Sequence, residues 1–166
     1  MMIFISLSTV SVLILAELLI KSRVEDNIEK GSERKLFGNK VLLRKVYNKG
    51  LCFNLLEEEP EKAELIQMTA TGTLTIMYLI GLLRKGTSFL KKIGLTLMTA
   101  GAWGNMLDRW IRGCVVDYIG VESKNKKLRD ITANLSDIFL FAGAILVLFG
   151  NLGSRKRKAS KTGKEK

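Results

Sequence analysis

Three acidic side chains lie inside or at the margin of long apolar segments, and a fourth follows just beyond one of them: Glu17, Asp108, Asp137 and Asp117. A charged group in such a place is costly and is usually functional or paired. Two carboxyl groups held close together in a medium of low dielectric constant cannot both ionise, so they share one proton and offer a base beside an acid. That combination can activate a water molecule for the hydrolysis of a peptide bond.

The residue types that are missing narrow the chemistry further. The 166 residues include no His, which excludes His-ligated zinc sites, Ser-His-Asp triads and Cys-His pairs. The two cysteines, Cys52 and Cys114, form no Cys-x-x-Cys pattern, so neither a zinc ribbon nor a disulfide framework fits. We expect two unpaired thiols, with one disulfide as the open alternative, and chemistry that uses no metal and no organic cofactor.

Four apolar segments carry these residues, at about residues 2–20, 65–83, 93–111 and 134–152. Each is close to the ~20 residues that a helix needs to cross a hydrocarbon core of roughly 30 Å. A soluble bundle would show a charged or polar stripe along each helix, which the second and fourth segments lack. A cleaved signal peptide would need a basic leader, and no Lys or Arg precedes the first segment. The sequence therefore predicts an all-α integral membrane protein with four transmembrane helices.

Lys and Arg predict how these helices are oriented, because an excess of them marks the cytoplasmic side of short loops. Residues 84–92 hold four basic residues and no acidic one, and residues 153–166 hold seven basic residues and one Glu. Residues 22–64 hold nine of each sign, and residues 113–133 hold four basic and three acidic residues. We expect the first two stretches to lie inside and the other two outside, with both termini cytoplasmic.

The net charge of +11 suggests an anionic partner, either nucleic acid or a membrane surface. The basic run at residues 155–158 directly follows an apolar segment, where an anchor on anionic lipid is the ordinary explanation. We therefore expect contact with membrane lipids and none with nucleic acid. The predicted organisation is one membrane domain over residues 1–152 and a basic cytoplasmic tail over residues 153–166.

The outer segment at residues 22–64 predicts a small extracytoplasmic β-rich region between the first two helices. Residues 24–35 are polar and compatible with a helix, whereas residues 40–53 are richer in Val, Leu, Tyr and Phe and contain the turn-like Asn48-Lys49-Gly50. Acidic residues around Pro60 are typical of a first helical turn and predict the start of the second helix.

The predicted topology places the acidic side chains at one depth, near the outer surface. Asp117 and Asp137 are separated by twenty residues, enough for the chain to leave the membrane and return, so the two carboxyl groups can meet. The alternative is a neutralised structural cluster of Asp108, Arg109 and Asp137, with Asp117 a solvated loop residue. The spacing alone leaves both possibilities open.

The sequence around these aspartates resembles the prolipoprotein signal peptidase family, also called signal peptidase II. The segments that carry the resemblance are Gly104-Asn105-Met106-Leu107-Asp108-Arg109, Gly113-Cys114-Val115-Val116-Asp117-Tyr118-Ile119, Asn134-Leu135-Ser136-Asp137 and Asn48-Lys49-Gly50-Leu51-Cys52-Phe53. It extends over residues 10–150, and the spacing of Asn-x-x-Asp-Arg to Val-Val-Asp is highly specific.

The resemblance implies an aspartic intramembrane peptidase of a bacterial cytoplasmic membrane. It would act as a monomer and cut the signal peptide from lipid-modified prolipoproteins, just before the cysteine that bears the diacylglyceryl group. By position, Asp117 and Asp137 match the family's catalytic pair. Residues that would orient the pair or contact the substrate are Asn48, Gly50, Asn105, Asp108, Arg109 and Asn134, with Glu17 and Lys21 in the family's first motif.

Two departures from the family pattern leave a second function open. The first motif usually has Asp where this chain has Glu17, and the residue before the second catalytic aspartate is usually Ala where this chain has Ser136. We expect the Ser136 hydroxyl to bond the Asp137 carboxylate. The alternative function is a non-catalytic or divergent lipoprotein-binding protein on the same scaffold. Gly101 and Gly104 suggest close helix packing, with room for acyl chains as the other possibility.

Overall fold

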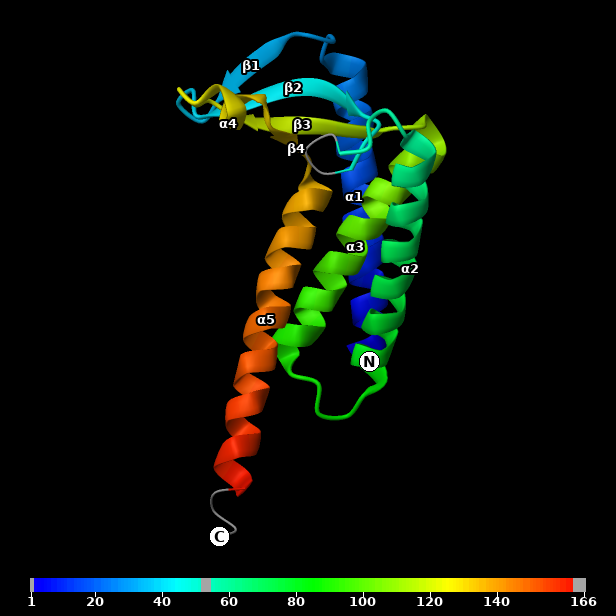
Figure 1. The fold of residues 1–166 in the computed structure, drawn as a ribbon, viewed down its shortest axis with the longest axis vertical. Helices are drawn as coiled ribbons and strands as arrows, with labels where there is room; N and C mark the ends of the chain where they lie inside the picture. Colours follow the sequence, from blue (N-terminus) through cyan, green and yellow to red (C-terminus); the bar gives the residue numbers. More distant parts are fainter. Residues whose placement is uncertain (1, 52–54, 163–166) are drawn as a thin grey trace.

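The computed structural model describes residues 2–51 and 55–162, and it has a helical bundle with a small β-sheet across one end (Figure 1). Four long helices form the bundle: α1 (Met2–Asn27), α2 (Pro60–Leu83), α3 (Phe89–Arg112) and α5 (Leu135–Thr162). The central helix α3 packs against α1, α2 and α5. Because α3 leads directly into the sheet and α5 leads away from it, the residues that connect them lie where bundle and sheet meet (Figure 1).

Three helical stretches are long and apolar enough to cross a membrane: Ile3–Asn27, Pro60–Leu83 and Leu135–Gly153. They coincide with the first, second and fourth predicted segments. Helix α3 is as long as α2, yet more of its residues are buried, Asn105, Asp108 and Arg109 among them. The third predicted span is therefore present as a helix, although its burial is that of a helix packed among other helices.

The sheet is antiparallel, in the order β1 (Glu33–Leu36), β2 (Val41–Asn48), β3 (Val115–Val121) and β4 (Thr132–Ala133). The predicted strand region agrees with β2. The helix suggested for residues 24–35 is wrong at its end, since α1 stops at Asn27 and β1 follows after a turn. The prediction also confined the β-rich region to one connection, whereas β3 and β4 come from the connection between α3 and α5, which also holds the short helix α4 (Lys126–Asp130).

Local signals set the ends of the helices that matter most. Ser88 caps α3, its hydroxyl accepting from the N–H of Lys91. Gly113 ends α3 with a φ of 72°, a left-handed conformation that glycine adopts at no steric cost, and β3 begins two residues later. Asp117 is thereby held on a strand directly after the helix that carries Asn105 and Asp108.

Glycines bring α3 and α5 into backbone contact. A Cβ atom added to Gly94 would lie 2.6 Å from the carbonyl oxygen of Gly143, and one added to Gly101 would lie 2.3 Å from that of Ser136. Small residues allow such approaches between helices in a membrane. Of the two roles suggested for Gly101 and Gly104, helix packing is the one that the structure bears out, because Ser136 and Leu140 fill the space beside them.

Candidate functional site

Asp117 and Asp137 lie next to each other where β3 meets the start of α5, and Asn134 connects them. The Asn134 side chain donates from Nδ2 to Oδ1 of Asp117 at 2.7 Å. Its backbone N–H donates to Oδ2 of Asp137 at 3.0 Å, and its Oδ1 accepts from the N–H of Asp137 at 3.0 Å. Asp117 is 4% exposed and Asp137 is partly exposed. The pair thus has one carboxyl group buried in protein and one at the edge of the site.

The exchange between Asn134 and Asp137 is a capping box, in which a helix's first residues satisfy one another's backbone N–H groups. An α-helix begins with four N–H groups that have no partner inside the helix. In α5 the N–H of Ile138 bonds the carbonyl of Asn134, and that of Asp137 bonds its side chain. The carboxyl group of Asp137 is consequently fixed in direction by the helix that carries it.

Both oxygens of Asp117 accept hydrogen bonds, since Asn48 Nδ2 donates to Oδ2 at 3.1 Å on the side opposite Asn134. Burial, assisted by the nearby charge of Asp137, raises the pKa of Asp117 from 3.8 to about 6, against the lowering effect of the two amide hydrogen bonds. A carboxyl group in this position keeps its proton well above the pH at which an exposed aspartate loses it.

A buried lysine lies behind the pair. Lys21 Nζ donates to Asn105 Oδ1 at 2.9 Å and forms ion pairs with Asp108 at 3.1 Å and Glu17 at 3.5 Å. Asn105 in turn donates from Nδ2 to Oδ1 of Asp137 at 2.8 Å. Lys21, Glu17 and Asp108 are each fully buried, so the charges are removed from solvent together and compensate one another.

Asp108 also ties α3 to the strand that carries Asp117. Its Oδ2 accepts from the N–H of Val116 at 2.7 Å, and its Oδ1 forms an ion pair with Arg112. Arg112 continues the network by pairing with Glu25 and donating to the hydroxyl of Ser22 at 2.8 Å, both on α1. The position of β3 is therefore fixed from α3 and α1 at once.

Arg109 has a separate task on the other side of α3. It donates to Gln67 Oε1 on α2 at 2.7 Å, to the carbonyl oxygen of Lys49 at 3.0 Å, and to that of Gly50. These bonds hold the turn that follows β2, directly after Asn48. Arg109 thus supports the backbone that presents Asn48 to Asp117.

Of the ten sequence-predicted site residues, the structure joins eight in one network of hydrogen bonds and ion pairs: Asn48, Asn105, Asp108, Asn134, Glu17, Lys21, Asp117 and Asp137. The other two, Arg109 and Gly50, bond each other beside it, close to Asp108 and Asn48 in the chain. The alternative cluster of Asp108, Arg109 and Asp137 is wrong, because Asp108 pairs with Lys21 and Arg112, and Asp117 is a buried strand residue. The expected bond from Ser136 is also wrong, since its buried hydroxyl has no hydrogen-bond partner in the described part of the chain.

Sequence reasoning missed several side chains around these residues, among them Arg112, Gln67 and Tyr118. Arg112 follows Asp108 by four positions, a spacing that places both on one face of a helix and that could have identified it. Nothing in the local pattern marks Gln67 as a partner of Arg109, because the two belong to different helices. Of the two cysteines, Cys114 is free and buried, and Cys52 lies outside the described residues.

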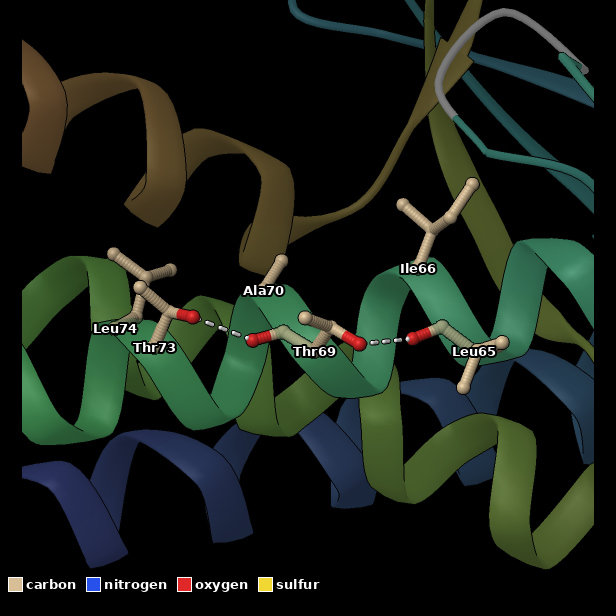
Figure 2. A pocket seen from close by; sticks show the side chains of 6 residues that line it. All are labelled: Leu65, Ile66, Thr69, Ala70, Thr73 and Leu74. Atoms are coloured by element: carbon tan, nitrogen blue, oxygen red, sulfur yellow. Dashed lines mark hydrogen bonds between the residues drawn. The ribbon is translucent and has the colours of Figure 1, made fainter.

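A hollow on the N-terminal half of α2 lies apart from this network (Figure 2). It is lined by Leu65, Ile66, Thr69, Ala70, Thr73 and Leu74. Both threonine hydroxyls donate to backbone oxygens of their own helix, Thr69 to Leu65 and Thr73 to Thr69, each at 2.8 Å. The lining therefore offers methyl groups and no titratable group.

Comparison with known proteins matches residues 9–152 to the family model described as signal peptidase (SPase) II. The lipoprotein signal peptidase of Streptococcus pneumoniae is 30% identical over 139 residues, which cover 81% of this chain and 83% of that protein. The one of Lactococcus lactis is 29% identical over 154 residues, covering 93% and 97%. A bacterial membrane enzyme solved by the in meso method at 2.3 Å resolution shares the fold, with a TM-score of 0.79 at 19% identity over 94% of this chain and 92% of that one.

Proposed function

This chain belongs to the signal peptidase II family of bacterial membrane peptidases, and from that membership we propose that it is an intramembrane aspartic endopeptidase. Its substrates would be diacylglyceryl-modified prolipoproteins, cut just before the lipid-modified cysteine. The observation that supports this most is the pair of carboxyl groups of Asp117 and Asp137, which share Asn134 as a hydrogen-bond partner.

In the proposed reaction the pair holds one proton. The ionised carboxylate takes a proton from a water molecule as that water attacks the carbonyl carbon of the scissile peptide bond. The neutral carboxyl group donates a hydrogen bond to the carbonyl oxygen and stabilises the tetrahedral gem-diol. Proton transfer to the leaving nitrogen then breaks the C–N bond. Because coupled groups titrate as a pair, we assign these roles to Asp117 and Asp137 jointly.

The surrounding residues would keep the two carboxyl groups in place while charge moves between them. Asn134 and Asn48 donate to Asp117, and Asn105 donates to Asp137 from a side chain that Lys21 holds. Amide donors stabilise an ionised carboxylate by hydrogen bonding, but they carry no positive charge. They therefore favour ionisation less than a Lys or Arg would, and the pair can keep one proton. Asp108 and Arg109 would act one step further away, through β3 and the turn at Gly50.

We further propose that α3 is a fourth membrane span and that both termini are cytoplasmic, as the distribution of Lys and Arg predicts. Its central position among α1, α2 and α5 supports this, because a helix surrounded by other helices needs no lipid-facing apolar surface. The peptidase domain would be residues 1–152 and the basic tail residues 153–166. The site would then lie at the extracytoplasmic surface of the cytoplasmic membrane, where a lipid-modified precursor is presented.

The test is cleavage of a lipidated prolipoprotein by the purified full chain in detergent or liposomes. We expect the wild type to release the signal peptide, and Asp117→Asn and Asp137→Asn to abolish release, because each removes the proton relay. Asp130→Asn is the matched control: this aspartate is exposed on α4, outside the network, and its variant should cleave at the wild-type rate.

Wild-type turnover by either dyad variant would contradict the aspartic mechanism. Binding of the lipidated precursor without any product, by a wild-type protein with native thermal stability, would favour the non-catalytic lipoprotein-binding function instead. Complementation in a bacterium depleted of its own prolipoprotein signal peptidase extends the test to native substrates.

A further inference from the structure

Tyr118 directly follows Asp117 on β3, and its side chain lies on the opposite face of the strand, between α1 and the start of α5. It is 5% exposed. Its hydroxyl donates to Oε2 of Glu17 at 2.8 Å and accepts from the backbone N–H of Leu135 at 3.3 Å. One hydroxyl group therefore connects three elements, α1, β3 and α5, which also pack together through Val24, Val116 and Leu135.

Glu17 completes the same arrangement with its other oxygen. Oε1 accepts from the N–H of Ser136 at 3.3 Å and faces Lys21 at 3.5 Å. Together with the capping box, this gives every one of the first four N–H groups of α5 a partner: Leu135 bonds Tyr118, Ser136 bonds Glu17, and Asp137 and Ile138 bond Asn134. Half of the cap of α5 is thus supplied from other elements.

We propose that Tyr118 is a positioning residue of the catalytic pair, acting through Glu17 and the first turn of α5. The tyrosine fixes Asp117 through the backbone of β3 and fixes Asp137 through the N–H of Leu135. A shift of α5 relative to β3 would change the distance between the two carboxyl groups. The Tyr118 hydroxyl opposes that shift through its bond to the Leu135 N–H and through its bond to Glu17. The inference rests on the proposed aspartic mechanism.

The length of the Glu17 side chain allows it to reach both Tyr118 and Ser136. An Asp at this position, as the family pattern has it, would end one methylene short of the Tyr118 hydroxyl and the Ser136 N–H. Gly104 provides the space for the Ser136 hydroxyl, since a Cβ atom there would lie 2.3 Å from it, and Cγ of Glu17 lies 3.6 Å from the same point, at ordinary contact distance. The two departures from the family pattern, Glu17 and Ser136, therefore meet at one glycine beside the tyrosine.

The hydroxyl is suited to donate at any working pH. Burial, followed by the charge of Glu17, raises the pKa of Tyr118 above its ordinary value of 10.0. Tyr118 stays protonated while Glu17 accepts, so the bond does not switch when the aspartate pair titrates.

The experiment compares Tyr118→Phe with Tyr78→Phe in the full chain. Tyr78 is a matched control because it is also buried and its hydroxyl donates to Ser6 at 2.9 Å, far from the site along the bundle. We expect Tyr118→Phe to lower kcat roughly 10- to 100-fold, the scale of an ångström-sized misplacement of a catalytic group, with KM within about twofold of wild type. Both substitutions remove one buried hydrogen bond, so the two variants should lose thermal stability to a similar degree. Tyr78→Phe should nevertheless keep the wild-type kcat.

Hydrogen–deuterium exchange of the peptide covering residues 134–140 provides a readout that needs no activity. Tyr118→Phe should exchange faster at the start of α5, and Tyr78→Phe should not. If the wild type does not cleave, the proposed function fails, while faster exchange in Tyr118→Phe would still show that the hydroxyl holds α5. Unchanged exchange with unchanged kcat overturns the positioning role.

Glu17→Asp asks the same question without altering the tyrosine. If Tyr118 acts through Glu17, this variant loses kcat as Tyr118→Phe does, and the double variant is little worse than either single variant. Losses that multiply in the double variant, or a KM that rises together with the loss of kcat, would mean that Tyr118 acts independently of Glu17 and would overturn the proposal. If Tyr118→Phe is purified in low yield, the kcat of Glu17→Asp still tests whether the bond between Glu17 and Tyr118 positions the pair.

Discussion

Asp117 combines a buried position, two amide donors and a neighbouring carboxylate, and each of these affects its proton affinity differently. Burial and the Asp137 charge favour the neutral acid, whereas Asn48 and Asn134 favour the anion. The balance leaves a pKa of about 6, so Asp117 changes its charge close to neutral pH. Two measurable consequences follow, one for activity and one for stability.

The first consequence is a bell-shaped pH profile. On the acidic limb the base of the pair is protonated, and on the alkaline limb the shared proton is lost. We expect the alkaline limb of kcat/KM to begin near the pKa of Asp117, about 6, and that of kcat to lie at higher pH, because bound substrate removes further water from the pair. Initial rates of prolipoprotein cleavage between pH 4 and 9 provide the measurement, and a profile with a single limb would contradict a shared proton.

The second consequence concerns unfolding. Because the native pKa of Asp117 is raised from 3.8 to about 6, the native state holds this proton more tightly than the unfolded state. The contribution of Asp117 to stability is therefore complete below pH 3.8 and is lost as the pH rises through about 6. Asp117→Asn removes this loss. Asn48, whose buried Oδ1 has no hydrogen-bond partner among residues 2–51 and 55–162, can rotate to accept from the new amide.

We thus expect Asp117→Asn to be more stable than wild type above pH 7, by on the order of 2–3 kcal/mol, and to lose that advantage below pH 4. Thermal unfolding in detergent at the two pH values measures the difference. An inactive variant with higher stability would show that the aspartate is kept at a cost to folding. A variant that is less stable at both pH values would contradict the assigned protonation state.

At the scale of elements, the interface between α3 and α5 leaves little room for added side-chain volume. Backbone meets backbone at Gly94 and Gly143 and again at Gly101 and Ser136, so no side chain can yield when volume is added. The same two helices supply Asn105 and Asp137, whose side chains are 2.8 Å apart. Any separation of the two helices would therefore lengthen the hydrogen bond between Asn105 and Asp137.

Gly101→Ala should therefore lower both stability and activity. The added methyl group would meet the carbonyl oxygen of Ser136 at 2.3 Å, and overpacking of this kind costs about 1–3 kcal/mol. Gly72→Ala on α2 is the control, because a Cβ atom there meets nothing within 4 Å and alanine favours a helix. Melting temperature and cleavage rate are measured for both variants, and equal effects of the two substitutions would refute the packing argument.

The elements also differ in how far the sequence predicts them. Apolar length and charge placement locate the long helices, since both are local properties of the chain. The sequence predicts only part of the sheet, because β3 is recognisable mainly by its pairing with β2, in which Asp117 stands opposite Val46, 71 residues earlier. Asp108 and Arg109 are neighbours in sequence, yet the helix turns them toward different partners, which explains why the alternative cluster of these two residues with Asp137 does not form.

For the whole molecule, the open question is the path of the chain through the bilayer. If α3 spans it, the loop after α2 and the sheet that follows α3 lie on opposite sides of the membrane (Figure 1). Lys85 and Lys126 are exposed residues in these two regions and suit chemical labelling.

Single-cysteine variants in a background where Cys52 and Cys114 are replaced by Ser test this topology. We expect a membrane-impermeant thiol reagent to label Lys126→Cys on intact cells or spheroplasts and to label Lys85→Cys only after the membrane is opened. Labelling of both positions from the same side would show that α3 does not cross the bilayer, and the proposed four-span arrangement would then be wrong.

The glycine contacts between α3 and α5 also bear on hydrophobic mismatch. A helix adapts to a thinner bilayer by tilting, and helices that slide past one another tilt separately. Contacts run from Ser88 and Gly150 at one end of this pair to Gly104 and Ser136 at the other, so α3 and α5 can tilt only as one body. A change in membrane thickness would then alter the depth of the aspartates while leaving Asn105 and Asp137 in register. We therefore expect the hydrogen bond between Asn105 and Asp137 to be the same in bilayers of different composition.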